Sequence, residues 1–474
     1  MRRIVVIGGG FSGVTAAVHL AARAGEPLEL RVVEPRPVAG PGLAHGSPHP
    51  DHRLNGPAGM HSIHPDAPQH FPAWLEASGA LAADPGAVAD GGAVFARRSD
   101  FGRYMADEFA RHARANPSGS RIDHVRDAAV GLRGTAGGIT VELAGGGTLE
   151  ADRIVLALGW SAPGVPAPLR GLAGERGWIG DPWAAGAIEA VPRDARVLLV
   201  GTGLTACDVW VALAAQGHRG PVVALSRRGL RPAPQNPFRA VPASIWTLLR
   251  EPEPAFLARH GRPATVRDAL RALRRDLAAI DPSSTSWHAP FDELRDAVPH
   301  FWPGWPGAER ARFARHLKGW YDAFRFRNPP QVARAVDAAL ADGRLRTVAG
   351  RLRGARRADG AIVVEWAARG TGEPCALQVD AVVNCTGPQP RPGAAGSPLW
   401  TRLLADGWVR EDPSGLGIEV DADCRVRDAR GRADGRLFAL GPPTAGALGE
   451  TTGVPFVARQ AIDALPAILG AARR

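Results

Sequence analysis

Short apolar runs that end in glycine mark the beginning of the chain. Residues 4–7 form an apolar run before three glycines, residues 14–24 predict a helix, and residues 28–33 predict a second strand. A strand, a glycine-rich turn, a helix and another strand in this order are typical of a parallel α/β sheet. We therefore expect this part of the chain to open such a sheet.

The same order of elements returns near residue 196. A predicted strand at residues 196–200 leads into a glycine turn at 201–203, a helix at 204–216 and a strand at 221–226. The two units lie about 190 residues apart, which is far too long for a solenoid repeat. The pattern therefore predicts an α/β protein with two Rossmann-like dinucleotide-binding domains.

The rest of the chain changes character at two places. Residues 162–174 are rich in Pro and Gly and are predicted to link the domains. Residues 236–340 combine Pro and Trp with helical periodicity, so we expect a helical insertion in the second domain. Further strands are predicted on both sides of these segments, at residues 139–143, 153–158, 344–348, 361–366, 377–385 and 436–440, with a final helix after them.

Composition sets the class of the protein. The 474 residues, 45% hydrophobic and 22% charged, are expected to form two or three globular domains. The net charge of +10 comes from scattered arginines, with Lys318 as the single lysine. We therefore predict no nucleic-acid partner, although a basic protein suits cofactors that carry phosphate.

Cysteine usage and hydropathy indicate the compartment. Cys207, Cys375, Cys385 and Cys424 form no C-x-x-C pair, so disulfides and zinc sites are not expected and a reducing cytoplasm fits. No apolar run approaches the ~18 residues of a membrane span, so no membrane association is predicted. The lack of a C-x-x-C pair also disfavours a disulfide reductase.

The first glycine turn is a G-x-G-x-x-G motif. Its glycines allow a tight turn and close approach of the backbone to a pyrophosphate, which the following helix N-terminus would bind. Glu34 ends the next predicted strand, where a carboxylate can accept hydrogen bonds from ribose hydroxyls. The cofactor-binding residues expected in this unit are Gly8, Gly10, Phe11, Ser12, Gly13 and Glu34.

The second glycine turn carries a different specificity signal. Where the first unit has an acidic residue, the second has Ser226, Arg227 and Arg228. A hydroxyl and guanidinium groups can bind a 2′-phosphate that a carboxylate would repel, so the pattern favours NADPH. The alternative is that the arginines are merely solvated. The residues expected to bind this cofactor are Gly201, Gly203, Leu204, Thr205, Ser226, Arg227 and Arg228.

Two apolar strands end in small residues. Gly159 follows residues 156–158, and Thr386 and Gly387 follow residues 383–385. Such ends let the chain cross between domains close to a dinucleotide, so these three residues are further candidates for cofactor contact. Cys385 is then interpreted as a packed small residue and not as a nucleophile.

Several segments resemble one bacterial family. The glycine openings, GLAHGSPHPDHRLNGPAGMHSIHPD, VGTGLTACD, ALSRRGL and LFALGPPTAGALGETTGVPFVARQA are similar to FAD/NAD(P)-binding flavoproteins related to flavin-containing and N-hydroxylating monooxygenases. The resemblance implies FAD in a domain built from residues 1–165 and 376–474. It implies NADPH in an inserted domain at residues 190–375.

The resemblance also assigns roles to single residues. It places Leu54 and Asn55 beside the flavin, with Asn55 as the catalytic candidate; the alternative for Asn55 is a turn before Gly-Pro. It brings Gly441 and Thr452 to the flavin as well. Glu450 is a candidate base or substrate-amine partner, with a helix cap as the equal alternative. The F-x-G-x-x-x-H signature of related monooxygenases is missing, which makes oxygen insertion less secure than cofactor binding.

Two further groups of residues need an interpretation. Arg325 and Arg327 alternate with aromatic residues and could form a carboxylate-binding wall for a substrate, or equally a solvated edge. The histidine cluster has no helical ligand spacing, so no metal is predicted, although one or two of its members could line the flavin. The cluster consists of His45, His49, His52, His61, His64 and His70.

These expectations lead to an enzyme. The function predicted first is an NADPH-dependent flavin monooxygenase that uses O2 and a flavin C4a-(hydro)peroxide to N-hydroxylate a small amine or amino-acid-like metabolite. The alternative is an NADPH oxidoreductase that passes electrons to a small acceptor or partner without oxygen insertion. A nucleotide-sensing protein with inactive flavin is a third reading, and the sequence leaves a homo-oligomer open.

Overall fold

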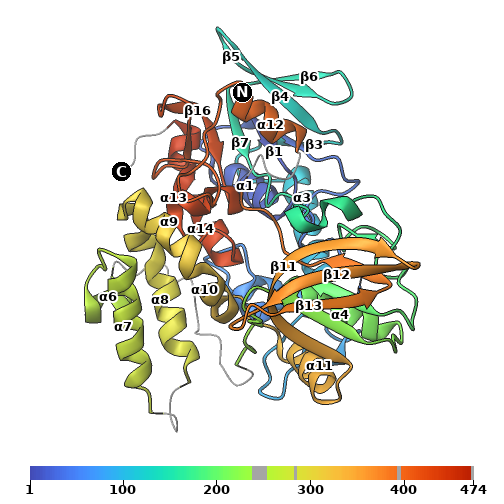
Figure 1. The fold of residues 1–474 in the computed structure, drawn as a ribbon. Coiled ribbons are helices and arrows are strands. Elements are labelled where there is room, and N and C mark those ends of the chain that lie inside the picture. Colours follow the sequence, from blue (N-terminus) through green and yellow to red (C-terminus); the bar gives the residue numbers. More distant parts are fainter. Residues whose placement is uncertain (48, 237–252, 282–285, 392–396, 471–474) are drawn as a thin grey trace.

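The computed structural model describes residues 1–47, 49–236, 253–281, 286–391 and 397–470. Two large sheets and one small sheet form the body of the molecule, and a group of helices lies at its side (Figure 1). The strands of the two predicted units belong to different large sheets. The expected duplication of the α/β unit is therefore confirmed.

The first large sheet has the strand order β15-β16-β7-β1-β2-β3. Strands β16, β7, β1, β2 and β3 run parallel, and β15 pairs antiparallel at the edge. The strands are β1 (Arg2–Ile7), β2 (Leu28–Val33), β3 (Arg121–Val125), β7 (Arg153–Leu156), β15 (Arg425–Arg427) and β16 (Ala433–Ala439).

Alternate residues of β1 bury opposite faces of this sheet. Ile4 and Val6 pack against α1 (Phe11–Arg23) and α14 (Val454–Leu469), whereas Val5 and Ile7 face a small antiparallel sheet and α12 (Pro398–Ala405). The small sheet consists of β4 (Ala129–Thr135), β5 (Gly138–Leu143) and β6 (Thr148–Ala151). Because both faces are covered, residues 4–7 of the strand are apolar, whereas its first two residues are arginines that are not buried.

The second large sheet has the order β13-β12-β11-β10-β9-β14-β8. Its parallel strands are β8 (Trp178–Ile179), β14 (Ala381–Asn384), β9 (Val197–Val200), β10 (Val222–Ser226) and the first part of β11 (Leu345–Ala358). The end of β11 pairs antiparallel with β12 (Ala361–Ala368), and β12 with β13 (Pro374–Val379). Helices α4 (Leu204–Ala215) and α11 (Pro330–Ala341) cover one face.

Two predicted boundaries need correction. Strand β14 pairs with β9, so the second sheet continues to Asn384 and the domain boundary expected at residue 375/376 lies after that residue. The helical insertion was expected at 236–340, but α11 packs on α4 and β11 as part of the second domain. Residues 237–252 of the predicted insertion lie outside the described residues.

The insertion that remains is a group of helices, here called the helical lobe (Figure 1). It has its own apolar core, which includes Phe256, Leu273, Trp302 and Trp305 and which Leu416 of the first domain joins. Its helices are α6 (Ala255–His260), α7 (Val266–Ala278), α8 (His288–Phe301), α9 (Gly307–His316) and α10 (Lys318–Arg325). The lobe therefore packs directly on the first domain.

Candidate functional site

The first glycine turn is built by close backbone contacts. Gly8 has φ +102°, and a Cβ there would lie 2.4 Å from the Ala157 carbonyl oxygen. A Cβ on Gly13 would lie 1.8 Å from the Gly8 carbonyl oxygen. Helix α1 begins at Phe11 with no side-chain hydrogen bond at its N-cap, Gly10, and with no acidic residue in its first turn. The residues present therefore fit a pyrophosphate, since the helix N-terminus is left to bind an anion.

Glu34 lies at the end of β2 beside this turn. Its side chain is buried, and its carboxylate accepts hydrogen bonds from the Gly9 N–H at 3.0 Å and from the Arg36 guanidinium at 3.1 Å. The carboxylate thus holds the turn against the neighbouring strand. Its predicted contact with a ribose stays a prediction.

Three other segments meet the first turn. A Cβ on Gly441, where φ is +77°, would lie 2.5 Å from the Ser12 hydroxyl. The Phe11 ring contacts His45 edge-on, with centroids 6.0 Å apart. Leu54 belongs to the same buried apolar cluster as Val14 of α1, and the Phe11 ring packs against this cluster. The structure therefore brings the predicted residues from distant parts of the chain to the end of β1.

The second turn repeats the design with one difference. A Cβ on Gly201 would lie 2.2 Å from the Cys385 carbonyl oxygen, whereas a Cβ on Gly203 would meet no atom within 4 Å. Gly203 caps α4 without a side-chain hydrogen bond, and α4 opens with Leu204 and Thr205. The space in front of Gly203 is therefore left for a ligand, and the residues fit a second dinucleotide.

The predicted 2′-phosphate residues follow β10 directly. The Ser226 hydroxyl accepts a hydrogen bond from Thr202 at 2.8 Å and another from the Gly229 N–H at 3.0 Å. Arg227 is exposed, and the Arg228 guanidinium donates to the His316 carbonyl of α9 at 3.4 Å. The two arginines thus differ, because the first is solvated and the second reaches the helical lobe.

The two crossings between the domains lie side by side. Ser161 and Gln389 form an isolated antiparallel bridge just beyond the two strand ends. Gly159 and Gly387 have φ values of +65° and +79°, which permit these sharp exits. The Thr386 hydroxyl donates to the Asn384 side-chain oxygen at 2.7 Å. Cys385 is buried and burial raises the pKa of its thiol, which supports its interpretation as a packed residue.

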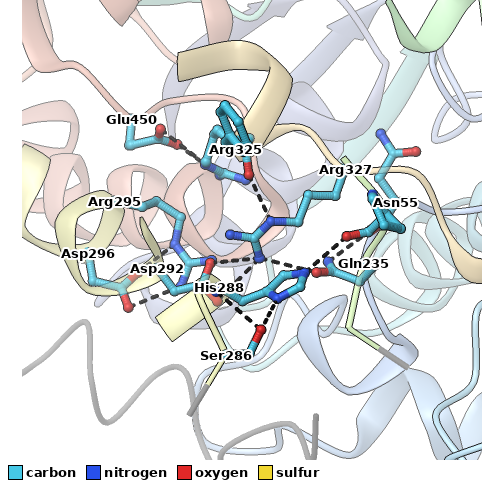
Figure 2. Close-up of polar contacts among 12 residues, drawn as sticks. Asn55, Gln235, Ser286, His288, Asp292, Arg295, Asp296, Arg325, Arg327 and Glu450 are labelled. Atoms are coloured by element: carbon cyan, nitrogen blue, oxygen red, sulfur yellow. Dashed lines mark hydrogen bonds and ion pairs between the residues drawn. The ribbon is translucent and has the colours of Figure 1, made fainter. Parts of the chain in front are cut away.

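Asn55 is held by contacts from both domains, of which Figure 2 shows the one with Gln235. The Gln235 amide donates to the Asn55 backbone carbonyl at 3.2 Å, and Arg98 donates to the Asn55 side-chain oxygen at 3.5 Å. Arg98 also forms a salt bridge of 2.9 Å with Asp208 of α4. The backbone of the candidate catalytic residue is therefore tied to the second domain, and its place beside the flavin stays a prediction.

Glu450 forms a buried ion pair with Arg325 (Figure 2). Its carboxylate accepts hydrogen bonds from Arg325 at 2.9 Å and from the Tyr321 hydroxyl at 2.7 Å. Burial opposes ionisation, but Arg325 outweighs it and the pKa of Glu450 is lowered. Since α14 begins after Gly453, the helix-cap alternative is wrong, and an ionised, paired carboxylate is a poor general base.

Arg327 belongs to a second buried charge cluster. Its guanidinium contacts Asp292 at 3.1 Å and donates to the Gln235 side chain at 3.2 Å. Arg295 pairs with Asp292 at 2.8 Å and with Asp296 at 2.7 Å. Burial lowers the pKa of Arg327 to about 9, which leaves it charged at neutral pH. The solvated-edge alternative is therefore wrong, and the charges of Arg325 and Arg327 are met by carboxylates of the chain itself.

The histidine cluster separates in the structure. Burial lowers the pKa of His45 to about 3 and that of His61 to about 4, so both rings are neutral beside Phe101. His64 and His70 lie with Glu108 of α3 (Arg98–Arg114), their potential ligand atoms within 4.8 Å of one another. Glu108 already binds His64 at 2.6 Å and Arg111 at 2.7 Å. A neighbouring guanidinium opposes a cation, so we assign no metal there.

Several residues of this region escape sequence reasoning. Gln235 belongs to no motif, and Asp208 ends the segment VGTGLTACD without an expected role; both act through contacts across more than a hundred residues. Arg98 opens an ordinary helix, and Asp292 and Arg295 read as helical surface charges. Trp160, directly after Gly159, lines a pocket in the helical lobe. Its place at a predicted crossing between the domains is the sequence signal that could have identified it.

Known proteins share this architecture. Residues 5–161 match the sequence model of an FAD-NAD(P)-binding family, and no curated protein sequence matches the chain. Ornithine hydroxylase from Pseudomonas aeruginosa is similar in structure, with 15% identity, a TM-score of 0.63 and 99% of each chain covered. So is ornithine N-hydroxylase from Kutzneria sp. 744, with 18% identity, a TM-score of 0.62 and 98% of each chain covered.

L-lysine 6-monooxygenase from Pseudomonas syringae has the same fold, with 17% identity, a TM-score of 0.62 and 99% of each chain covered.

Among the described residues, no helix combines the length and apolar character that crossing a bilayer requires. Residues 5–161 therefore match an FAD-NAD(P)-binding domain, and the chain as a whole shares the fold of these hydroxylases, of which the Kutzneria enzyme was solved with FAD and NADP+.

Proposed function

We propose that the protein is an NADPH-dependent flavin monooxygenase that oxygenates an amine nitrogen of a small molecule. The observation that carries the proposal is the position of Asn55, which the first domain supplies and the second domain holds through Gln235 and the Arg98–Asp208 pair. A residue that contacts of both domains hold in place can meet both cofactors. The named structural neighbours hydroxylate ornithine or lysine, which supports an amine as the acceptor.

The residues of the chain have defined tasks in this proposal. Bound FAD would supply the redox chemistry with NADPH and O2, and the protein would supply orientation and exclusion of water. The Asn55 amide can donate or accept a hydrogen bond without changing its charge. His45 and His61 are neutral, so they add no charge beside the turn that would hold the flavin.

Asn55→Ala is expected to lower the rate of product oxygenation at least tenfold, about 1.4 kcal/mol of lost transition-state stabilisation. FAD content is expected to stay unchanged, because Asn55 contacts its neighbours through its backbone carbonyl as well. The measurement is incorporation of 18O from 18O2 into a hydroxylated amine. Gln378→Ala, which removes an exposed amide of β13, serves as the control.

The same measurement separates the proposal from electron transfer alone. If NADPH is consumed while no amine acquires 18O, and an added quinone accepts the electrons, then the monooxygenase proposal fails. The alternative of an oxidoreductase without oxygen insertion would then replace it.

Replacing both Arg227 and Arg228 with serine is expected to raise the KM for NADPH at least tenfold while the KM for NADH changes less than threefold. The reason is that guanidinium groups next to Ser226 can bind a 2′-phosphate, which NADH lacks. Steady-state flavin reduction with each nucleotide is the measurement. Arg344→Ser removes an exposed arginine of the same domain and should leave both constants unchanged. Equal losses for both nucleotides would contradict the assignment.

A further inference from the structure

A pocket of about 480 Å³ opens inside the helical lobe, next to the junction of the domains. Helices α7, α8 and α10 form most of its wall. Trp160 of the first crossing and residues 449, 450 and 452 of the loop before α14 complete it. The pocket therefore connects the lobe with the segments that the proposed function places near the flavin, and its size suits a small-molecule ligand.

The wall of this pocket is aromatic and aliphatic. Helices α8 and α10 and the segment between them contribute large aromatic rings to the wall. Helix α7 contributes leucine side chains. The rings pack against one another, as Trp302 and Phe313 do edge-on with centroids 5.3 Å apart. Representative lining residues are Leu273, Phe291, Trp302, Trp305, Phe313 and Phe324.

Both acidic groups of the wall, Asp322 and Glu450, already have partners within the chain, and Arg274, the remaining charged lining residue besides Lys318, is exposed to solvent. Glu450 binds Arg325 and Tyr321, and Lys318 pairs with Asp322 one turn later in α10. A zwitterionic amino acid would need one unpaired cation and one unpaired anion to replace its hydration. The described wall offers no unpaired anion to an ammonium group, whereas an apolar ring gains contact area from the aromatic and aliphatic side chains.

We infer that the substrate is an amine with an aromatic or bulky apolar body, and not a basic amino acid such as ornithine or lysine. The inference rests on the proposed function for the choice of an amine, and on the pocket for the apolar body. The uncharged amine is the form that an apolar wall favours, and it is also the form with a free nitrogen lone pair. The aromatic side chains of the lobe thereby determine specificity.

The test is equilibrium binding to the FAD- and NADP⁺-loaded full chain, measured by calorimetry. The probes are tryptamine and 2-phenylethylamine on one side and L-ornithine and L-lysine on the other. We expect the aromatic amines to bind at least tenfold more tightly. Equal or tighter binding of L-ornithine or L-lysine overturns the inference, and so does binding of neither class.

A variant ties the binding to this pocket. Leu270 is a half-buried pocket residue of α7, so Leu270→Glu adds a charge to the wall at a position where the helix tolerates it. Binding of tryptamine is expected to weaken at least tenfold, with FAD content unchanged. Val88→Glu makes the same exchange at an exposed position of the first domain and should leave binding unaltered. Unchanged tryptamine binding in Leu270→Glu would overturn the inference.

Failure of the proposed function gives a different result. If the aromatic amines bind as expected but acquire no 18O and do not stimulate NADPH consumption, the pocket assignment stands and oxygenation is wrong. If L-ornithine or L-lysine is oxygenated in preference, the monooxygenase stands and the inference about the pocket is wrong.

Discussion

Gly13→Ala is expected to destabilise the protein by about 3 kcal/mol and to abolish retention of FAD. A Cβ at this position would lie 1.8 Å from the Gly8 carbonyl oxygen, and that atom belongs to backbone that cannot rotate away. The turn would have to open, which would displace the helix N-terminus that is left to bind the pyrophosphate. The measurement is FAD content after purification, combined with urea unfolding followed by circular dichroism.

A matched glycine distinguishes this effect from a general loss of glycine flexibility. Gly25 lies in the loop after α1, and a Cβ there would meet no atom within 4 Å. Gly25→Ala should therefore keep both the FAD content and the unfolding midpoint of the parent protein. If Gly13→Ala retains FAD to the same extent as Gly25→Ala, the first glycine turn is not the flavin site.

Arg295→Met is expected to destabilise the protein by about 3–5 kcal/mol, the usual cost of leaving a buried charge without its partner. Arg295 contacts Asp292 at 2.8 Å and Asp296 at 2.7 Å, and the side chains of all three are at most 10% exposed. Methionine retains most of the apolar volume of arginine, so the loss reports the charge and not a cavity. The measurement is the free energy of unfolding of the FAD-loaded protein in urea.

A surface pair provides the control for this second prediction. Arg219 and Asp194 are joined at 2.8 Å, but both side chains are about 70% exposed. Exposed pairs are screened by water and contribute little, so Arg219→Met should leave the unfolding midpoint unchanged. Similar losses in both variants would show that the cluster of α8 is not acting as a buried charge network.

The buried charges also explain how the helical lobe is fixed to the rest of the molecule. Arg325 of α10 binds Glu450 of the first domain, and Arg327 reaches Gln235, whose amide holds Asn55. These contacts run from the lobe to the candidate catalytic residue (Figure 2). A lobe attached by oriented ion pairs can keep its pocket aligned with Asn55, because such pairs are directional whereas apolar contacts are not.

The glycine turns and their strands could be predicted from sequence because their causes are local. Gly8 and Gly201 both have positive φ values, and a Cβ on either would meet the carbonyl oxygen of the residue that directly follows the neighbouring strand. The apolar runs on either side read as buried strands for the same reason. The arginines after β10 also follow from spacing, since the end of the second strand always lies beside the glycine turn.

Tertiary structure alone decided the boundary of the domains and the role of α11. The apolar positions of α11 would suit a helical lobe as well as a sheet, because an amphipathic pattern does not identify the partner that buries it. Strand β14 is short and apolar and could have joined either large sheet. Its pairing with β9 is a contact between residues far apart in the chain, which no local pattern records.

The same distinction holds within the candidate site. The sequence by itself determined that two dinucleotide turns exist and that Asn55, Arg325, Arg327 and Glu450 are unusual. Folding decided that Arg325 and Glu450 neutralise each other and that the aromatic residues of the lobe enclose a pocket. Pairing of buried charges and the shape of a cavity depend on side chains from several elements at once, so they exist only after the domains have packed together.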